Sequence, residues 1–212
     1  MADYSAWENT LSRDVESLVV NYFNDTKPGD VIYDVGANVG VFSDKVLDRY
    51  KDVQLVLFEP VRDYYEYLKE KYSNNSNVKI YNFALVERER PLAICRDLHN
   101  LGYNTISEIQ MYGSIENIKG VSLSDIIKSE NLPLPNLIKV DVEESEYLFI
   151  LGCKELFKYH LPRKIVMEVG ILKSNSLWEK EKEMMEYIFS MGYRRFEYTE
   201  YTHTYEAVFI LE

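Results

Sequence analysis

Apolar residues follow two alternating patterns along this chain. In one pattern they form short continuous runs rich in Val, Ile and Leu, which predict strands buried on both faces of a parallel sheet. In the other they return every three or four residues, which predicts amphipathic helices. Strands are predicted at 31–35, 53–58, 77–84, 137–140 and 164–170, and helices at 5–23, 42–50, 61–72, 147–151 and 178–189. The alternation is typical of an α/β fold.

The two ends of the chain complete this fold prediction. Residues 193–198 and 205–211 predict two strands with a short connection, a hairpin that would give the sheet an antiparallel strand. The helix predicted at 5–23 should lie against the rest of the protein as a cover. A chain of 212 residues is expected to form one domain, with 1–30 as the helical cover and 31–212 as the main part.

Periodicity is lost between residues 91 and 120. The segment is followed by Val121-Ser-Leu-Ser-Asp-Ile-Ile127, which predicts a short strand and a capped helical turn. Long irregular segments inside a compact domain are usually functional or mobile. We therefore interpret 91–120 as a lid on the substrate side, with an ordered surface excursion as the alternative.

The first predicted strand leads into a glycine-containing turn, Val31-Ile-Tyr-Asp-Val-Gly-Ala-Asn-Val-Gly40. Gly36 and Gly40 permit a tight turn, and ligands of open α/β sheets bind where a strand meets its helix in this way. The spacing is not the dinucleotide fingerprint, because Asn38 stands where a second glycine would approach a pyrophosphate. The loop therefore suits a nucleoside ligand without phosphates, with Asp34 available for a cationic amine. The alternative is that Asp34 only orders the turn.

Further carboxylates follow other predicted strands. Glu59, 23 positions after Gly36, ends the second strand and could accept both hydroxyl groups of a ribose. Asp141 ends a later strand, and Glu168 lies near the end of another. Because parallel strands end at the same edge of a sheet, these carboxylates should face one site. A solvated strand-end carboxylate remains the alternative for Glu59.

Composition removes several classes of function. The 24 basic and 35 acidic residues give a net charge of −11, which argues against electrostatically driven binding of nucleic acid. Two cysteines, Cys95 and Cys153, imply no disulfide framework, and the pair Cys95 and His99 lacks partners for a zinc site. With neither a signal-peptide pattern nor a membrane-spanning apolar run, we expect a cytoplasmic protein.

The order of motifs resembles the class I methyltransferases that depend on S-adenosylmethionine (SAM), and more closely the FkbM-type family, whose characterised members methylate hydroxyl oxygens on sugars and polyketides. The resemblance covers about residues 31–170 and is carried by the following motifs: Tyr33-Asp-Val-Gly-Ala-Asn-Val-Gly40, Leu57-Phe-Glu-Pro60, Phe83-Ala-Leu85, Val121-Ser-Leu-Ser-Asp125, Ile138-Lys-Val-Asp-Val-Glu143, Ser145 to Gly152, and Val166-Met-Glu168. It implies a Rossmann-like fold with a mostly parallel seven-stranded sheet, an antiparallel C-terminal strand and helices on both faces.

The resemblance also implies a role for individual residues. SAM would be the cofactor and S-adenosylhomocysteine the product. The implied cofactor-binding residues are Asp34, Gly36, Ala37, Asn38 and Gly40 around the methionine part, Glu59 and Pro60 at the ribose and adenosine, Asn82, Phe83 and Ala84 near the adenine, and Asp141 beside the reacting methyl group. Asp141 is our candidate for the catalytic base or for the group that orients the hydroxyl, supported by Glu168 or Glu143. The alternative is that Asp141 only contacts the cofactor. Glu144 stands where the family usually has glycine. We therefore carry over the family's fold, but not its backbone geometry on the substrate side.

Other interpretations stay open at this point. Asp141, Glu143, Glu144 and Glu168 could hold Mg²⁺, but neighbouring side chains point in different directions, so a metal-free site is favoured. A non-catalytic binding module and an NAD-dependent oxidoreductase are the alternative functions, the latter disfavoured by the glycine spacing. The expected partner is a small-molecule or glycan acceptor, with neither nucleic acid nor membrane. Whether the protein forms a homo-oligomer is left open.

Overall fold

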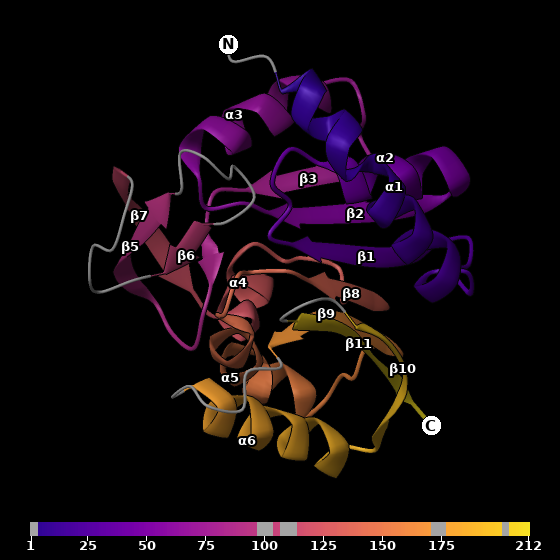
Figure 1. Ribbon diagram of the computed structural model, residues 1–212, viewed down its shortest axis with the longest axis vertical. Coiled ribbons are helices and arrows are strands. Elements are labelled where there is room, and N and C mark those ends of the chain that lie inside the picture. Colours follow the sequence, from indigo (N-terminus) through magenta and orange to yellow (C-terminus); the bar gives the residue numbers. More distant parts are fainter. Residues whose placement is uncertain (1–3, 97–103, 107–113, 171–176, 201–203) are drawn as a thin grey trace.

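The computed structural model describes residues 4–96, 104–106, 114–170, 177–200 and 204–212, and within this part the chain folds around a seven-stranded sheet (Figure 1). In order across the sheet, its strands are β10 (Tyr193–Glu200), β11 (Thr204–Leu211), β9 (Lys164–Gly170), β8 (Leu137–Val140), β1 (Asp30–Val35), β2 (Val53–Phe58) and β3 (Val78–Tyr81). The pairs from β9 to β3 are all parallel, whereas β11 is antiparallel to both of its neighbours. The predicted mixed sheet is confirmed.

The central strands are buried on both faces, as their continuous apolar runs predict. Every residue of β1 and β8 is buried, including the charged Asp30, Asp34 and Lys139. The parallel register places Val35 of β1 beside Phe58 of β2 and Val140 of β8. These three strands therefore end together at one edge of the sheet.

Helices cover both faces of the sheet (Figure 1). One apolar cluster joins buried side chains of α1 (Ser5–Tyr22), α2 (Val41–Arg49) and α3 (Arg62–Lys71) to one face. A second joins α4 (Leu123–Ser129), α5 (Glu146–Phe157) and α6 (Leu177–Ser190) to the other face. The predicted helices are confirmed, and α5 is longer than expected. None of the helices in the described residues is long and apolar enough to cross a membrane.

A second, four-stranded sheet corrects two of the predictions. Its order is β4 (Ala84–Leu85), β7 (Ser114–Val121), β5 (Arg90–Arg96) and β6 (Asn104–Ile106). The strand predicted at 77–84 is therefore two strands in two sheets. The chain leaves the main sheet after Tyr81, and the Asn82 amide donates hydrogen bonds to the carbonyls of Glu59 and Pro60, 2.9 Å each.

The segment 91–120 is not irregular where the structure describes it, because β5 pairs with β7 along seven residues. The alternative of an ordered excursion is thus correct for the described residues, while 97–103 and 107–113 of the expected lid lie outside them. The strands were missed because most of their side chains are exposed or half-buried, and only a few, such as Leu92, Ile94 and Ile118, face the core. The capped turn is confirmed, since the Ser122 hydroxyl accepts a hydrogen bond from the Asp125 amide at the start of α4.

Candidate active site

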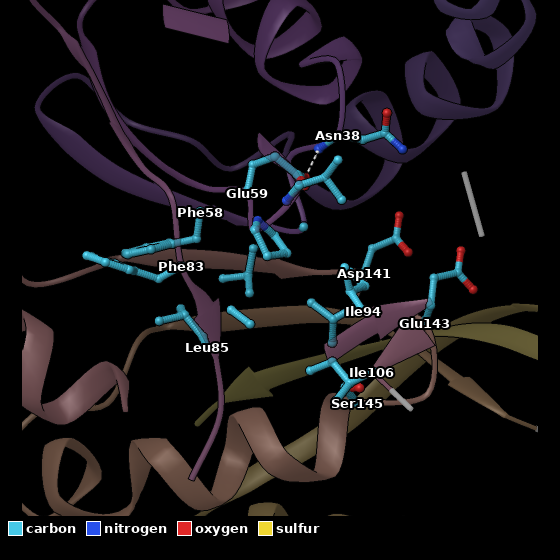
Figure 2. Close-up of a pocket in the computed structure, with 16 residues that line it drawn as sticks. Asn38, Phe58, Glu59, Phe83, Leu85, Ile94, Ile106, Asp141, Glu143 and Ser145 are labelled. Carbon is cyan, nitrogen blue, oxygen red and sulfur yellow. Dashed lines mark hydrogen bonds between the residues drawn. The ribbon is translucent and has the colours of Figure 1, made fainter. Parts of the chain in front are cut away.

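A cavity lies at the carboxyl ends of β1, β2 and β8 (Figure 2). The ends of these strands supply Gly36, Glu59 and Asp141 to its wall. The second sheet closes it from the other side with Ile94 of β5 and Ile106 of β6. The cavity therefore lies between the two sheets. The sequence predicted the edge of the main sheet, but it did not predict the second sheet.

The turn after β1 depends on the absence of a side chain at Gly36. Its φ is +78°, and a Cβ there would lie 1.8 Å from the backbone oxygen of Asp141. Glycine thus lets the turn lie directly against the end of β8. Gly36 and Asn38 line the cavity, whereas Ala37 and Gly40 of the predicted binding loop do not.

Glu59 is buried at the cavity wall and is held by backbone amides. Its Oε2 accepts a hydrogen bond from Asn38 N at 2.7 Å, and its Oε1 accepts one from Val61 N at 2.8 Å. Burial raises the pKa of this carboxyl to about 8, although the two amides oppose the shift. In the ionised form each oxygen has a second lone pair, so both can then accept a hydrogen bond from a ligand hydroxyl.

Apolar residues form one end of the cavity. Figure 2 shows Phe58, Phe83 and Leu85 at the end of the cavity that lies away from Asp141 and Glu143. The ring of Tyr81 stacks against both phenylalanine rings, with centroids 5.7 Å from Phe58 and 6.2 Å from Phe83. Pro60 and Ala84 also line the cavity, whereas Asn82 does not line it and instead fixes the backbone at Glu59 and Pro60. This end can receive a flat apolar ring.

The structure gives Asp34 a different environment from the one expected. Its side chain is completely buried and does not line the cavity. The Ser43 hydroxyl donates a hydrogen bond to its Oδ2 at 2.7 Å, and Lys139 Nζ lies 3.2 Å from its Oδ1. Burial raises the pKa of this carboxyl, with Lys139 and Ser43 opposing the shift. Asp34 is therefore paired inside the protein rather than presented to a ligand.

Three carboxylates gather at the other end of the cavity. Asp141, Glu143 and Glu168 each place one oxygen within 4.8 Å of the others. Asp141 and Glu143 line the cavity and lie beside each other in Figure 2. Glu168 does not line it, and the exposed Glu144 is not part of the group. Carboxylate oxygens are the ligands that Mg²⁺ prefers, so these three residues could hold such an ion.

The backbone at Glu143 and Glu144 is unusual. Both have left-handed φ values, +48° and +69°, which residues other than glycine rarely adopt. A glycine at position 144 would adopt this φ without a steric penalty. Burial, followed by the negative charges of Asp141 and Glu168, raises the pKa of Glu143 to about 9. Glu143 is thus protonated at neutral pH and can donate a hydrogen bond.

Sequence reasoning missed several residues of the site. Ile94 and Ile106 come from strands that had no clear pattern. Ser145 lines the cavity and belongs to a quoted motif, but its position gave no indication of a role. Lys139 was missed because a lysine within a strand usually reaches solvent, and its carboxylate partner Asp34 is 105 residues away.

Comparisons with known proteins agree with this geometry. Residues 34–195, well over half of the chain, match the family model described as the methyltransferase FkbM domain. The 31-O-demethyl-FK506 methyltransferase FkbM of Streptomyces tacrolimicus is 27% identical over an alignment of 173 residues. The match covers 68% of this chain and 66% of that protein, just under two thirds of the relative.

Solved structures show the same fold at low sequence identity. A precorrin-6y C5,15-methyltransferase from Geobacter metallireducens has a TM-score of 0.55 and 10% identity, covering 96% of this chain and 88% of that chain. Aeropyrum pernix fibrillarin with natively bound SAM has a TM-score of 0.54 and 8% identity, covering 87% and 67% respectively. A putative caffeoyl-CoA O-methyltransferase from Staphylococcus aureus has a TM-score of 0.52 and 10% identity, covering 99% and 85%. The chain therefore belongs to the FkbM family of methyltransferases, which implies SAM as its cofactor.

Proposed function

We propose that this protein transfers a methyl group from SAM to a hydroxyl oxygen of a sugar, a glycan or a small natural product. The observation that carries the proposal is the placement of Glu59 and Asp141 in the wall of one cavity. Glu59 suits the cofactor's ribose, and Asp141 suits the acceptor's hydroxyl. The relative from Streptomyces tacrolimicus is named as an O-methyl-forming enzyme, which supports oxygen as the acceptor atom.

The residues present fit SAM. Both oxygens of Glu59 can accept hydrogen bonds from ribose hydroxyls, and Phe58, Phe83 and Ala84 offer an apolar wall to the adenine. The turn at Gly36 and Asn38 would border the methionine part. When bound, the cofactor supplies an electrophilic methyl group on its sulfonium.

Asp141 is placed to act as the base. Its side chain is 45% exposed at the cavity, so a hydroxyl of the acceptor can reach it. In our proposal, Asp141 takes the hydroxyl proton as the oxygen–methyl bond forms and the sulfur–methyl bond breaks. The protonated Glu143 donates a hydrogen bond that orients the acceptor or Asp141. Alignment of this kind contributes roughly 7–11 kcal/mol, and a positioned base contributes about 10²–10⁴-fold.

Charge favours an acceptor without negative groups. Among the described residues of the cavity wall, Glu59, Asp141 and Glu143 are acidic and none is basic. The nearby ammonium of Lys139 is buried against Asp34. None of the described wall residues offers a positive charge to a phosphate or carboxylate on the acceptor, which supports a neutral hydroxyl compound.

The test is a screen for methyl transfer from labelled SAM to neutral sugars, glycans and polyhydroxylated natural products, with sugar phosphates for comparison. The variant Asp141→Asn should lower turnover about 10²–10⁴-fold while SAM affinity stays within a few-fold. The exposed Asp48→Asn in α2 serves as the matched control and should leave both unchanged. Loss of SAM binding and turnover together would refute the base role. SAM binding without methyl transfer to any acceptor would favour a non-catalytic binding module.

The same assay tests the metal alternative. Turnover that persists in excess chelator supports the metal-free mechanism. Turnover that is lost in chelator and restored by Mg²⁺ would instead assign Asp141, Glu143 and Glu168 to an ion.

A further inference from the structure

Lys139 of β8 has no role in the reaction as proposed above. Its side chain is only 9% exposed. The ammonium donates a hydrogen bond to the carbonyl oxygen of Gly36 at 2.9 Å. It also lies 3.2 Å from Oδ1 of Asp34 and 3.5 Å from Oδ2 of Asp141. One cation thus contacts the end of β1, the turn that follows it and the end of β8.

One hydrogen bond, to the carbonyl of Gly36, and two ion pairs, with Asp34 and Asp141, hold the lysine. An ammonium has three N–H donors, and here three oxygens surround it. Burial disfavours its charge, but the carboxylates of Asp34 and Asp141 outweigh that effect and raise its pKa, so it stays protonated. The cation is therefore a fixed part of the wall beneath the cavity.

The arrangement goes beyond a simple buried ion pair. Asp34 alone would neutralise the lysine, since it is completely buried beside it. The ammonium is nevertheless shared with Asp141, which faces the cavity, and with the carbonyl of Gly36, which borders it. Both of these partners belong to the residues that would contact cofactor or acceptor.

We propose that Lys139 is a positioning residue for the methyl transfer. Its ammonium fixes the Gly36 peptide, and with it the turn against the cofactor, and it orients the carboxylate of Asp141 toward the acceptor. The effects on SAM binding and turnover rest on the proposed function, whereas the effect on the turn does not.

The chain contains a matched control at the opposite edge of the sheet. Lys164, the first residue of β9, is also buried. Its ammonium donates to the carbonyl of Tyr22 at 2.7 Å and to Oδ1 of Asp25 at 2.5 Å. It makes the same kinds of contact, a backbone carbonyl and a carboxylate, without lining the cavity.

The experiment compares two double variants, Asp34→Asn/Lys139→Met and Asp25→Asn/Lys164→Met. Each removes one acidic and one basic side chain, so the net charge of the protein is unchanged. Both members of each pair are changed because Lys139→Met alone would leave the buried Asp34 carboxylate without its partner and could prevent folding. If the Met variant does not fold, Asp34→Asn/Lys139→Gln takes its place, because the amide can still donate a hydrogen bond within the wall.

Three quantities are measured on the folded proteins. They are amide hydrogen exchange of residues 36–40 without ligand, SAM affinity by calorimetry, and kcat at saturating SAM with an acceptor from the screen. We expect the Lys139 variant to exchange at least tenfold faster in this turn, to bind SAM at least tenfold more weakly and to turn over at least tenfold more slowly. The Lys164 variant should stay within twofold of the wild type in all three.

Separate results decide the two proposals. A folded Lys139 variant with wild-type SAM affinity and kcat overturns the positioning role, as does an equal loss in the Lys164 variant. A wild-type protein that binds no SAM refutes the proposed function instead. In that case the exchange rates alone decide on Lys139, and rates within twofold of the wild type overturn its role.

Discussion

Replacing Glu143 by glutamine should make the ligand-free protein more stable. Burial, with the neighbouring negative charges of Asp141 and Glu168, raises the pKa of Glu143 from 4.5 to about 9. Between these two values the folded protein retains a proton that the unfolded chain releases. The free energy of unfolding therefore falls as the pH rises through this window. Glutamine mimics the protonated carboxyl and is neutral at every pH, so the variant avoids this loss.

The size of the effect follows from the same values. One pH unit corresponds to about 1.4 kcal/mol, so the wild type would lose at most about 3 kcal/mol between pH 4.5 and pH 7 through this group. Glu143 is partly open to solvent, which reduces the figure. We therefore expect Glu143→Gln to raise the free energy of unfolding at pH 7 by about 1–3 kcal/mol. Near pH 5 the gain should fall to about a quarter of its value at pH 7.

Urea unfolding at pH 5, 6, 7, 8 and 9, in chelator, measures this gain. The neighbouring Glu144→Gln is the matched control, since Glu144 shares the left-handed backbone but is exposed. We expect its effect to stay below about 0.5 kcal/mol. If Glu143→Gln is no more stable than the wild type at pH 8, Glu143 is ionised in the folded protein and its proposed role as a hydrogen-bond donor is wrong.

Two further predictions concern the backbone of the site. Glu144→Gly should raise the free energy of unfolding by up to about 1 kcal/mol in urea, because glycine adopts the φ of +69° without a steric penalty; a loss of stability would contradict this. Gly36→Ala should abolish SAM binding in calorimetry. In urea unfolding it should lower the free energy of unfolding by at least about 2 kcal/mol more than Gly29→Ala does. Both glycines have φ near +80°, but a Cβ at Gly29 meets nothing within 4 Å, so equal costs would show that the clash with Asp141 is relieved.

The main sheet could be predicted because its strands are buried on both faces. A run such as Val53–Phe58 can be identified as a strand without knowing which strands it pairs with. The end of that run then places Glu59 at the edge of the sheet. The carboxylates at the ends of β1, β2 and β8 could be brought to one edge for the same reason. The sequence also named Asp141, Glu143, Glu144 and Glu168 as one acidic group, but only the structure shows that the first two and Glu168 come together and that Glu144 does not.

What could not be predicted depends on contacts between distant segments. The second sheet is half exposed, so β5 and β7 have weak alternation and are specified by pairing with each other. Asp34 was expected to contact the ligand, because the sequence does not show that Lys139 lies beneath it. A buried polar residue is placed by its partner, and the partner is not visible in a local pattern.

SAM binding at Glu59 tests the central claim most directly. Calorimetry would compare SAM and NAD on the wild type, Glu59→Ala and Glu59→Gln. The glutamine variant is included because Ala also leaves the amides of Asn38 and Val61 without their acceptor. Loss of a charge-assisted hydrogen bond is worth about 1.5–3 kcal/mol, so we predict that SAM, and not NAD, binds the wild type and that Glu59→Ala binds it at least tenfold more weakly. No SAM binding, or an affinity unchanged in both variants, would contradict the assignment of this cavity as the cofactor site.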